Sequence, residues 1–306
     1  MSKKEHRVSK RYAKRQFNTV GLLLIMYALA VLIVPYFLHM YLVSEDSIIV
    51  HDEMLYYGLY FIIILFGTLI PFFVMRKIFK IPFKKINRNF SATFVDLFVQ
   101  TIVFFTICIG LTYVSNILFS YLGMQGKLIS SIGFSYDEAN LDNALYVFML
   151  IVVTPIVEEY AFRGVLLNVL SKFGKTFGLY AMATIFALAH LSFVEMIPAF
   201  IMGVELGKTS LRYKSIQPTI FIHMLFNGLI YALCVIPASI TKYMAYGIAA
   251  IVTIAAYLIL SGRYERIRIQ KLRSNRITNI VFFSRPAIII AMLLMVLDSA
   301  LFLFFN

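Results

Sequence analysis

The chain has 306 residues, of which 61% are hydrophobic and 14% charged, with a net charge of +13 and a mean hydropathy of +0.85. A water-soluble protein of this length could not cover its surface with so few polar residues. Apolar runs recur along the whole chain, and this predicts an all-α fold, a polytopic integral membrane helical bundle. The composition therefore excludes a soluble globular protein.

The apolar runs, separated by polar and charged loops, predict about nine transmembrane helices. We expect them at about 18–43, 55–75, 92–121, 143–170, 176–191, 194–207, 216–236, 243–261 and 286–305. Gly203 and Gly207 stand at GxxxG spacing, which predicts close contact with a neighbouring helix. Asp96 lies near a helix boundary, where a capping or snorkelling role is favoured over catalysis.

The positions of the basic residues predict how the chain is oriented. Of the 28 Lys and Arg, 25 fall on alternate polar segments, and seven of them lie in the tail 1–15. The positive-inside rule assigns these segments to the cytoplasm. We therefore expect a multi-pass cell-membrane protein with a cytoplasmic N-terminus and an external C-terminus. The basic excess then faces anionic lipid, and no nucleic acid is expected as a partner.

One apolar helix carries three ionisable residues, namely Glu158, Glu159 and Arg163. A charge in the hydrocarbon layer costs about 2.5–3.5 kcal/mol on insertion scales and indicates a functional site. Glu159 and Arg163 are four apart and can pair on one helix face. Glu158 is rotated by about 100° from Glu159, which leaves it as a candidate general base or metal ligand. In a hairpin that turns near Gly174, Glu159 and His190 come to the same depth.

Two further polar pairs occur in the helices that follow. Phe186 and His190 are four residues apart, and so are His223 and Asn227. The spacing places each pair on one helix face. Hydrogen bonding between helices would explain any one of these side chains. Together with the charged residues of the preceding helix, they predict one polar site.

These residues form three short motifs. EEYAFR (158–163), FALAH (186–190) and HMLFN (223–227) resemble the EExxxR, FxxxH and HxxxN motifs of the CAAX protease and bacteriocin-processing family, also called CPBP or Abi. Each motif is weak by itself, but three in the right order and at matching depth are specific. The resemblance covers about residues 145–235.

The resemblance implies a glutamic-type intramembrane endopeptidase, related to the enzymes that trim prenylated CAAX proteins. It implies that Glu158 and His190 activate water and that His223 and Asn227 stabilise the oxyanion. Structural support would come from Glu159, Arg163 and Phe186. The chain would then divide into a basic cytoplasmic tail (1–17), N-terminal transmembrane helices (18–142), a catalytic core (143–236) and C-terminal transmembrane helices (237–306).

A metal-dependent version of the protease stays open. We expect no cofactor, because the sequence has no HExxH zinc signature. Glu158, His190 and His223 nevertheless offer carboxylate and imidazole groups that can bind zinc.

Two alternatives belong to other classes of protein. One is a non-catalytic membrane scaffold that regulates a sensor kinase or a cell-wall enzyme, although a scaffold has no need of Glu158 and His190 together. The other is a transporter, for which we find no inverted repeat. The expected partners are the lipid bilayer and a peptide or membrane-protein substrate, with the sensor kinase or cell-wall enzyme as the partner of a scaffold.

Overall fold

The described part of the chain is entirely helical. The computed structural model describes residues 3–34, 53–86, 89–121, 144, 147–190, 193–235 and 276–305. Helices are joined there by short turns, and these ranges contain no strand. The prediction of an all-α fold is therefore confirmed for the described residues.

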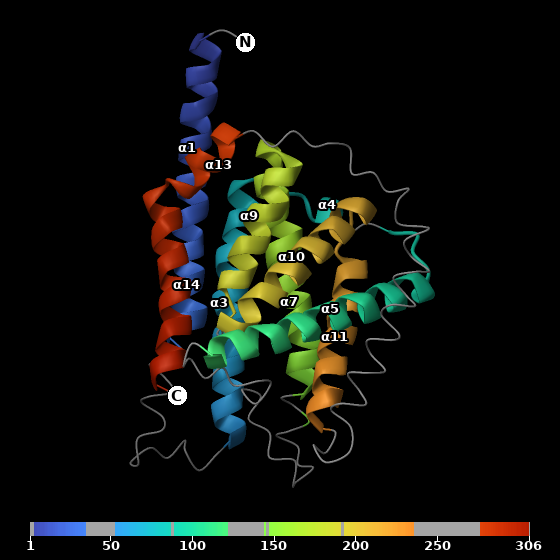
Figure 1. Cartoon of the computed structure of the whole chain (residues 1–306). Helices are drawn as coiled ribbons and strands as arrows, with labels where there is room; N and C mark the ends of the chain where they lie inside the picture. Colours follow the sequence, from blue (N-terminus) through green and yellow to red (C-terminus); the bar gives the residue numbers. More distant parts are fainter. Residues whose placement is uncertain are drawn as a thin grey trace.

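The helices are arranged around a central helical hairpin, which runs from η3 (Met149–Val153) to α9 (Lys175–Leu188) (Figure 1). Those that precede it are α1 (Lys3–Ala28), the π-helix η1 (Leu29–Ile33), α3 (Glu53–Ile78), α4 (Phe83–Ile86) and α5 (Phe94–Tyr121). Those that follow it are α10 (Phe193–Tyr213), α11 (Gln217–Val235), α13 (Arg276–Phe283) and α14 (Pro286–Phe305).

The first and last helices of the chain pack against each other. In Figure 1, α14 lies along α1, and a Cβ atom on Gly21 would come within 2.7 Å of the backbone of Ala287. The two backbones can approach this closely because glycine has no side chain. Next to this contact, the ring of Phe17 lies 5.1 Å from that of Phe282 and 5.7 Å from that of Phe177. Both ends of the chain are thus held against the hairpin.

Helix α5 begins with a side-chain cap that involves Thr93 and Asp96. The Asp96 backbone N–H donates to the Thr93 hydroxyl over 3.1 Å, and that hydroxyl donates to the Asp96 carboxylate over 2.7 Å. This reciprocal arrangement satisfies a backbone donor at the helix start. The capping side chain is Thr93, and of the two roles predicted for Asp96, capping or snorkelling, the structure shows its carboxylate taking part in the cap.

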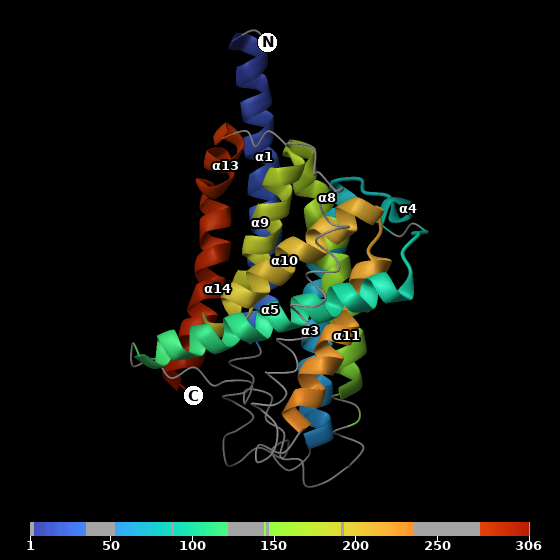
Figure 2. The ribbon, with the colours of Figure 1, turned by 45° about the vertical axis from the view of Figure 1, so that its right-hand side comes forward.

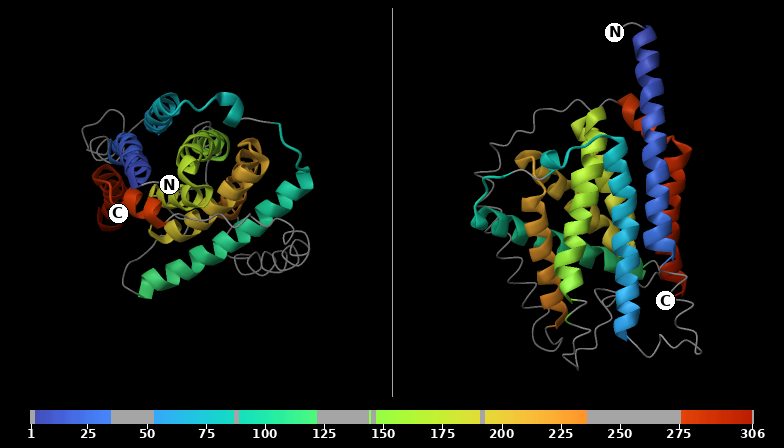
Figure 3. Two further views of the ribbon diagram at one scale, coloured as in Figure 1. Left: turned by 90° about the horizontal axis from the view of Figure 1, so that it is seen from above. Right: turned by 180° about the vertical axis from the view of Figure 1, so that it is seen from behind.

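The direction of α5 differs from that of its neighbours. Figures 1 and 2 show α5 running transversely to α3 and α14, and the view from above in Figure 3 shows it along one side of the bundle. By length and composition, two described helices contain a stretch apolar enough to span a membrane: Phe61–Ile78 in α3 and Phe94–Thr112 in α5. Because these two cross, they cannot both follow one membrane normal. The nine predicted spans stay a prediction, and the span at 243–261 lies outside the described residues.

A long helix followed by a sharp turn forms the first half of the hairpin. In order it comprises η3 (Met149–Val153), α7 (Thr154–Glu158), η4 (Glu159–Leu166), α8 (Leu167–Leu170) and η5 (Ser171–Phe173), and the second half is α9 (Lys175–Leu188). Gly174 makes the turn with φ of +138°, a conformation that favours glycine. A Cβ on Gly178 would lie 2.6 Å from the backbone nitrogen of Ser171, so the two halves touch directly after the turn.

The first half of the hairpin contains two π-helical segments, η3 and η4, on either side of α7. Pro155 in α7 has no N–H to donate, which weakens the α-helical ladder at this point. Further along, the Asn168 amide donates to the carbonyls of Gly164 and Arg163 over 2.9 and 3.3 Å. These side-chain bonds add to the backbone bonding at the end of η4. Glu159 and Arg163 both lie within η4.

Helix α10 packs closely on α9. A Cβ added to Gly203 would meet Ala183 at 3.1 Å, and one added to Gly207 would overlap the side chain of Leu179. Only small residues permit this approach. The close contact predicted from the GxxxG spacing is confirmed.

Candidate active site

Four helices supply six of the seven residues that the motifs single out, and the seventh directly follows one of them. Glu158 ends α7, Glu159 and Arg163 lie in η4, Phe186 lies in α9, and His223 and Asn227 lie in α11; His190 follows the end of α9. The structure brings Glu158, Glu159, Arg163, Phe186, His190 and His223 together, through direct contacts from one to the next.

Glu159 is the centre of a buried polar cluster. Its Oε1 atom lies 2.8 Å from Arg163 Nη1 and 2.9 Å from His223 Nδ1. Glu159 and Arg163 are completely buried, and His223 is 4% exposed. The pair with Arg163 is the one that the four-residue spacing predicts. The bond to His223 joins η4 to α11 across 64 positions of sequence, and no local pattern predicts it.

Phe186 links this cluster to the second histidine. The guanidinium carbon of Arg163 lies 4.1 Å from the centre of its ring, which is a cation–π contact. The ring centres of His190 and His223 lie 4.9 and 6.4 Å from that of Phe186, both in edge-to-face arrangements. Phe186 therefore contacts both Arg163 and His190, which lies on the same helix face as the four-residue spacing predicts.

The partners of the two histidines determine which ring nitrogen carries the proton. His190 Nδ1 lies 2.8 Å from the Phe186 carbonyl oxygen, which can only accept, so Nδ1–H donates. His223 Nδ1–H donates in the same way to the Glu159 carboxylate. In each neutral ring the lone pair is then on Nε2. His223 Nε2 lies 3.9 Å from Glu158 Oε2.

The predicted span 176–191 places His190 within a helix, but in the structure His190 lies just beyond the helix end. Helix α9 ends at Leu188, and the His190 N–H bonds to Ala187 with the tighter spacing of a final turn. The last carbonyls of a helix lack backbone partners, and the imidazole of His190 satisfies the one on Phe186. His190 thus closes the end of α9.

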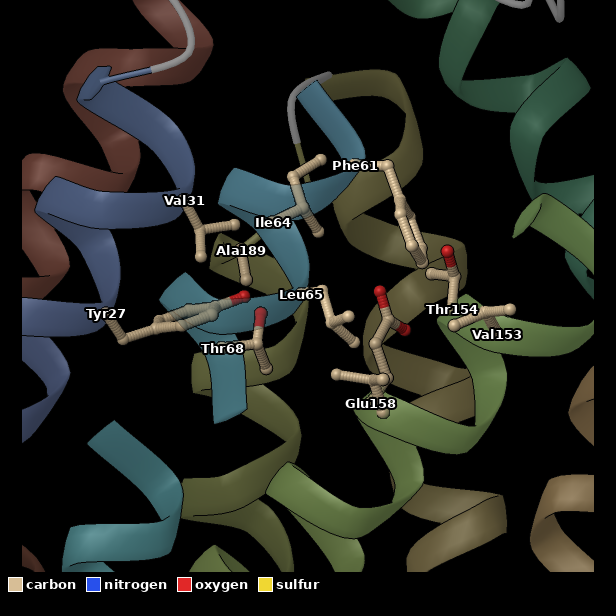
Figure 4. Close-up of a pocket in the computed structure, with 11 residues that line it drawn as sticks. Tyr27, Val31, Phe61, Ile64, Leu65, Thr68, Val153, Thr154, Glu158 and Ala189 are labelled. Atoms are coloured by element: carbon tan, nitrogen blue, oxygen red, sulfur yellow. The ribbon is translucent and has the colours of Figure 1, made fainter. Parts of the chain in front are cut away.

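Glu158 has a different environment from Glu159. Its side chain is 30% exposed and faces a cavity of about 180 Å³. Figure 4 shows its carboxylate between Leu65 and Phe61 on one side and Thr154 on the other. Of the two adjacent glutamates, Glu158 is the one that a substrate can reach.

Besides Glu158, the cavity is lined by ten residues that the sequence analysis does not single out. They are Tyr27, Val31, Phe61, Ile64, Leu65, Thr68, Val153, Thr154, Val157 and Ala189. Those of α1, η1 and α3 lie far from the motifs in sequence, and only the three-dimensional fold brings them to Glu158.

Asn227 is held to the first half of the hairpin. Its Nδ2 atom donates to the Leu150 carbonyl in η3 over 2.9 Å. A side-chain amide nitrogen has two N–H groups, so this bond leaves a second donor for a substrate. The bond also gives Asn227 a structural role that the motif does not indicate, because it joins α11 to η3.

The described ranges hold no group of three or more His, Cys, Asp or Glu side chains close enough together to bind a metal ion. Glu158, His190 and His223 therefore do not form a ligand set in this conformation.

Comparison with known proteins identifies one family. Residues 140–229 match the model of the family described as type II CAAX prenyl endopeptidase Rce1-like. No curated protein and no solved structure matches significantly. The matched segment contains the central hairpin, α10 and most of α11, and with them all seven candidate residues. It confirms the resemblance of this chain to the CAAX protease family.

Proposed function

We propose that the protein is an intramembrane endopeptidase in which Glu158 is the general base for hydrolysis of a peptide bond. One observation carries the proposal. Of the two adjacent glutamates, Glu159 is buried and bonded to Arg163 and His223, while Glu158 faces a cavity. The family match supports a protease. The substrate is a peptide precursor or a membrane protein, and the enzyme lies in the cell membrane with its N-terminus in the cytoplasm.

In the proposed reaction, Glu158 accepts a proton from water, and the water oxygen attacks the carbonyl carbon of the scissile bond. His190, whose Nδ1–H is held by Phe186, offers the Nε2 lone pair as a hydrogen-bond acceptor for the same water. A general base positioned in this way contributes about 10²- to 10⁴-fold to the rate.

The attack places negative charge on the carbonyl oxygen. His223, when protonated at Nε2, and the second N–H of Asn227 are the proposed donors to it. When the intermediate collapses, the proton held by Glu158 passes to the leaving amine. The bond from His223 to Glu159 orients the ring, and it leaves the Nε2 edge facing Glu158.

The test compares purified full-length wild-type protein with Glu158→Gln in lipid nanodiscs. Both are incubated with a defined mixture of peptides, some carrying prenylated cysteine, and products are identified by mass spectrometry. Terminal proteomics of membranes from cells that express each variant provides a second readout. We expect cleavage by the wild type and at least a 100-fold loss in Glu158→Gln, with unchanged thermal unfolding.

Glu205→Gln is the matched control, because it makes the same chemical change in α10, where Glu205 pairs with Lys208. It should retain cleavage. Equal products from wild type and Glu158→Gln, in both readouts, would overturn the proposed function. Stoichiometric zinc, with activity lost on chelation and restored by zinc, would replace the general-base role by metal ligation through Glu158, His190 and His223.

A further inference from the structure

The cavity beside Glu158 is built from two separate parts of the chain. One wall belongs to the family-matching segment 140–229 and consists of Val153, Thr154, Val157, Glu158 and Ala189. The opposite wall lies outside that segment and consists of Tyr27, Val31, Phe61, Ile64, Leu65 and Thr68. The catalytic candidate is therefore on one side, and α1, η1 and α3 form the other.

Helix α3 presents one face to the cavity. Its four lining residues follow the helical spacing i, i+3, i+4 and i+7, which places them in one stripe; they are Phe61, Ile64, Leu65 and Thr68. Ile62, Phe66 and Ile70 on the same helix are about half exposed, at 50–52%. The two faces of α3 are thus distinct, and only one of them meets Glu158.

The opposite wall is held at a fixed distance by a close helix contact. A Cβ on Gly67 would lie 2.9 Å from Val31 Cγ2 and 3.1 Å from Ala30 Cβ. Helix α3 therefore touches η1 directly beside the cavity, and Val31 is both part of this contact and part of the lining. The cavity is preformed by helix packing, as ligand sites usually are.

The size and chemistry of the cavity indicate what it can hold. An engineered protein cavity of about 150 Å³ lined by aliphatic and aromatic residues binds benzene, and this cavity of about 180 Å³ is slightly larger. It has room for one apolar side chain of the size of Leu, Ile or Phe. Figure 4 shows its apolar lining between the Glu158 carboxylate and the side chains of Tyr27 and Thr68.

We propose that this cavity binds one apolar side chain of the substrate, adjacent to the peptide bond that Glu158 attacks. Helices α1 and α3 then determine which residue is accepted there, although the catalytic candidates lie elsewhere in the chain. This inference rests on the proposed function. A hydrophobic pocket discriminates by about 10- to 200-fold for each methylene that fits or fails to fit.

The test changes the volume of the cavity at Leu65, a lining residue that lies between Thr68 and Glu158 in Figure 4. Leu65→Phe narrows the cavity, and Leu65→Ala widens it. Ile62→Phe and Ile62→Ala are matched controls on the exposed face of the same helix. Each full-length variant is incubated in nanodiscs with a random-sequence peptide mixture, and kcat/KM for each residue type near the cut is derived from product mass spectra.

We expect wild type and both Ile62 variants to cut beside Leu, Ile or Phe at one fixed position. Leu65→Phe should shift the preference at that position toward Ala and Val, and Leu65→Ala should shift it toward Phe, each by at least 10-fold. If Leu65→Phe does not fold, as judged by thermal unfolding, Leu65→Ala decides alone.

The outcomes separate this inference from the proposed function. Cleavage by the wild type with the same residue preference in the folded Leu65 variants would overturn the inference and leave the proposed function intact. A uniform loss across all peptides would also overturn it, because a side-chain subsite must discriminate. Wild-type cleavage no greater than that of Glu158→Gln would overturn the proposed function and this inference with it.

Discussion

Replacing Arg163 by Met should strongly destabilise the protein, because it leaves the Glu159 carboxylate in the core without its cation. Both side chains are completely buried, and the charged atoms are 2.8 Å apart. Removing one partner of a buried ion pair costs about 3–5 kcal/mol. A typical domain is stable by about 5–15 kcal/mol. We expect a loss near 3 kcal/mol, since His223 still donates to Glu159.

The double variant Glu159→Leu with Arg163→Met should be much more stable than the sum of its single changes. Two independent losses would add to about 6–10 kcal/mol. Replacing both charges by apolar groups of similar size removes the unpaired charge and is often neutral. The remaining cost is the buried N–H of His223, which loses its acceptor and contributes about 1–3 kcal/mol. The expected coupling energy is therefore at least about 3 kcal/mol.

The assay is a double-mutant cycle on purified protein, with the free energy of unfolding measured in one detergent. The Glu205–Lys208 pair of α10 is the control cycle, because it is partly exposed, with side chains 19% and 31% accessible. Partly exposed pairs are worth about 1 kcal/mol or less, so its coupling should be small. Additivity within about 0.5 kcal/mol in the Glu159–Arg163 cycle would refute the reasoning.

Three other predictions follow from single features. Reporter fusions at 76–90, 171–175, 208–214 and 262–276 should give cytoplasmic signals, and a cytoplasmic signal after Asn306 would contradict the nine-span topology. Gly178→Ala should lower the free energy of unfolding by about 1–3 kcal/mol, and with it the melting temperature, because the new Cβ would overlap Ser171. Gly110→Ala should not lower the melting temperature, because a Cβ there has no atom within 4 Å. Asn227→Ala should lower kcat by about 100-fold with little change in KM, and an unchanged kcat would exclude it as an oxyanion donor.

Local spacing in the sequence predicts a substantial part of this site. The pair of Glu159 with Arg163 follows from four-residue spacing on one helix. The contact of Gly203 with α9 follows from the GxxxG pattern, and the cap at Asp96 from its place at a helix start. In each case the interacting groups belong to one helix or to helices adjacent in sequence. The physical cause of the contact is therefore visible in a short window.

The remaining features depend on distant contacts. The bond between Glu159 and His223 and the wall formed by Leu65 arise only when helices far apart in sequence pack together. The π-helical segments are also not predicted by an analysis that assumes 3.6 residues per turn, because their backbone bonds have a wider spacing. Likewise, α5 has the composition of a spanning helix, but its packing directs it across the bundle.

The buried cluster of Glu159, Arg163 and His223 lowers the stability of the fold, and a purely structural role does not explain why the charges are present. In the described part of the chain, the Nε and Nη2 atoms of Arg163 have no hydrogen-bond partner, and unsatisfied buried donors are unfavourable. An apolar pair would stabilise the fold as well or better. We infer that the charges are kept because Glu159 orients His223 toward Glu158. The double variant Glu159→Leu with Arg163→Met should then recover most of its stability but lose turnover, with kcat reduced more than KM is raised. A stable double variant with wild-type kcat would show that Glu159 does not position His223 for catalysis.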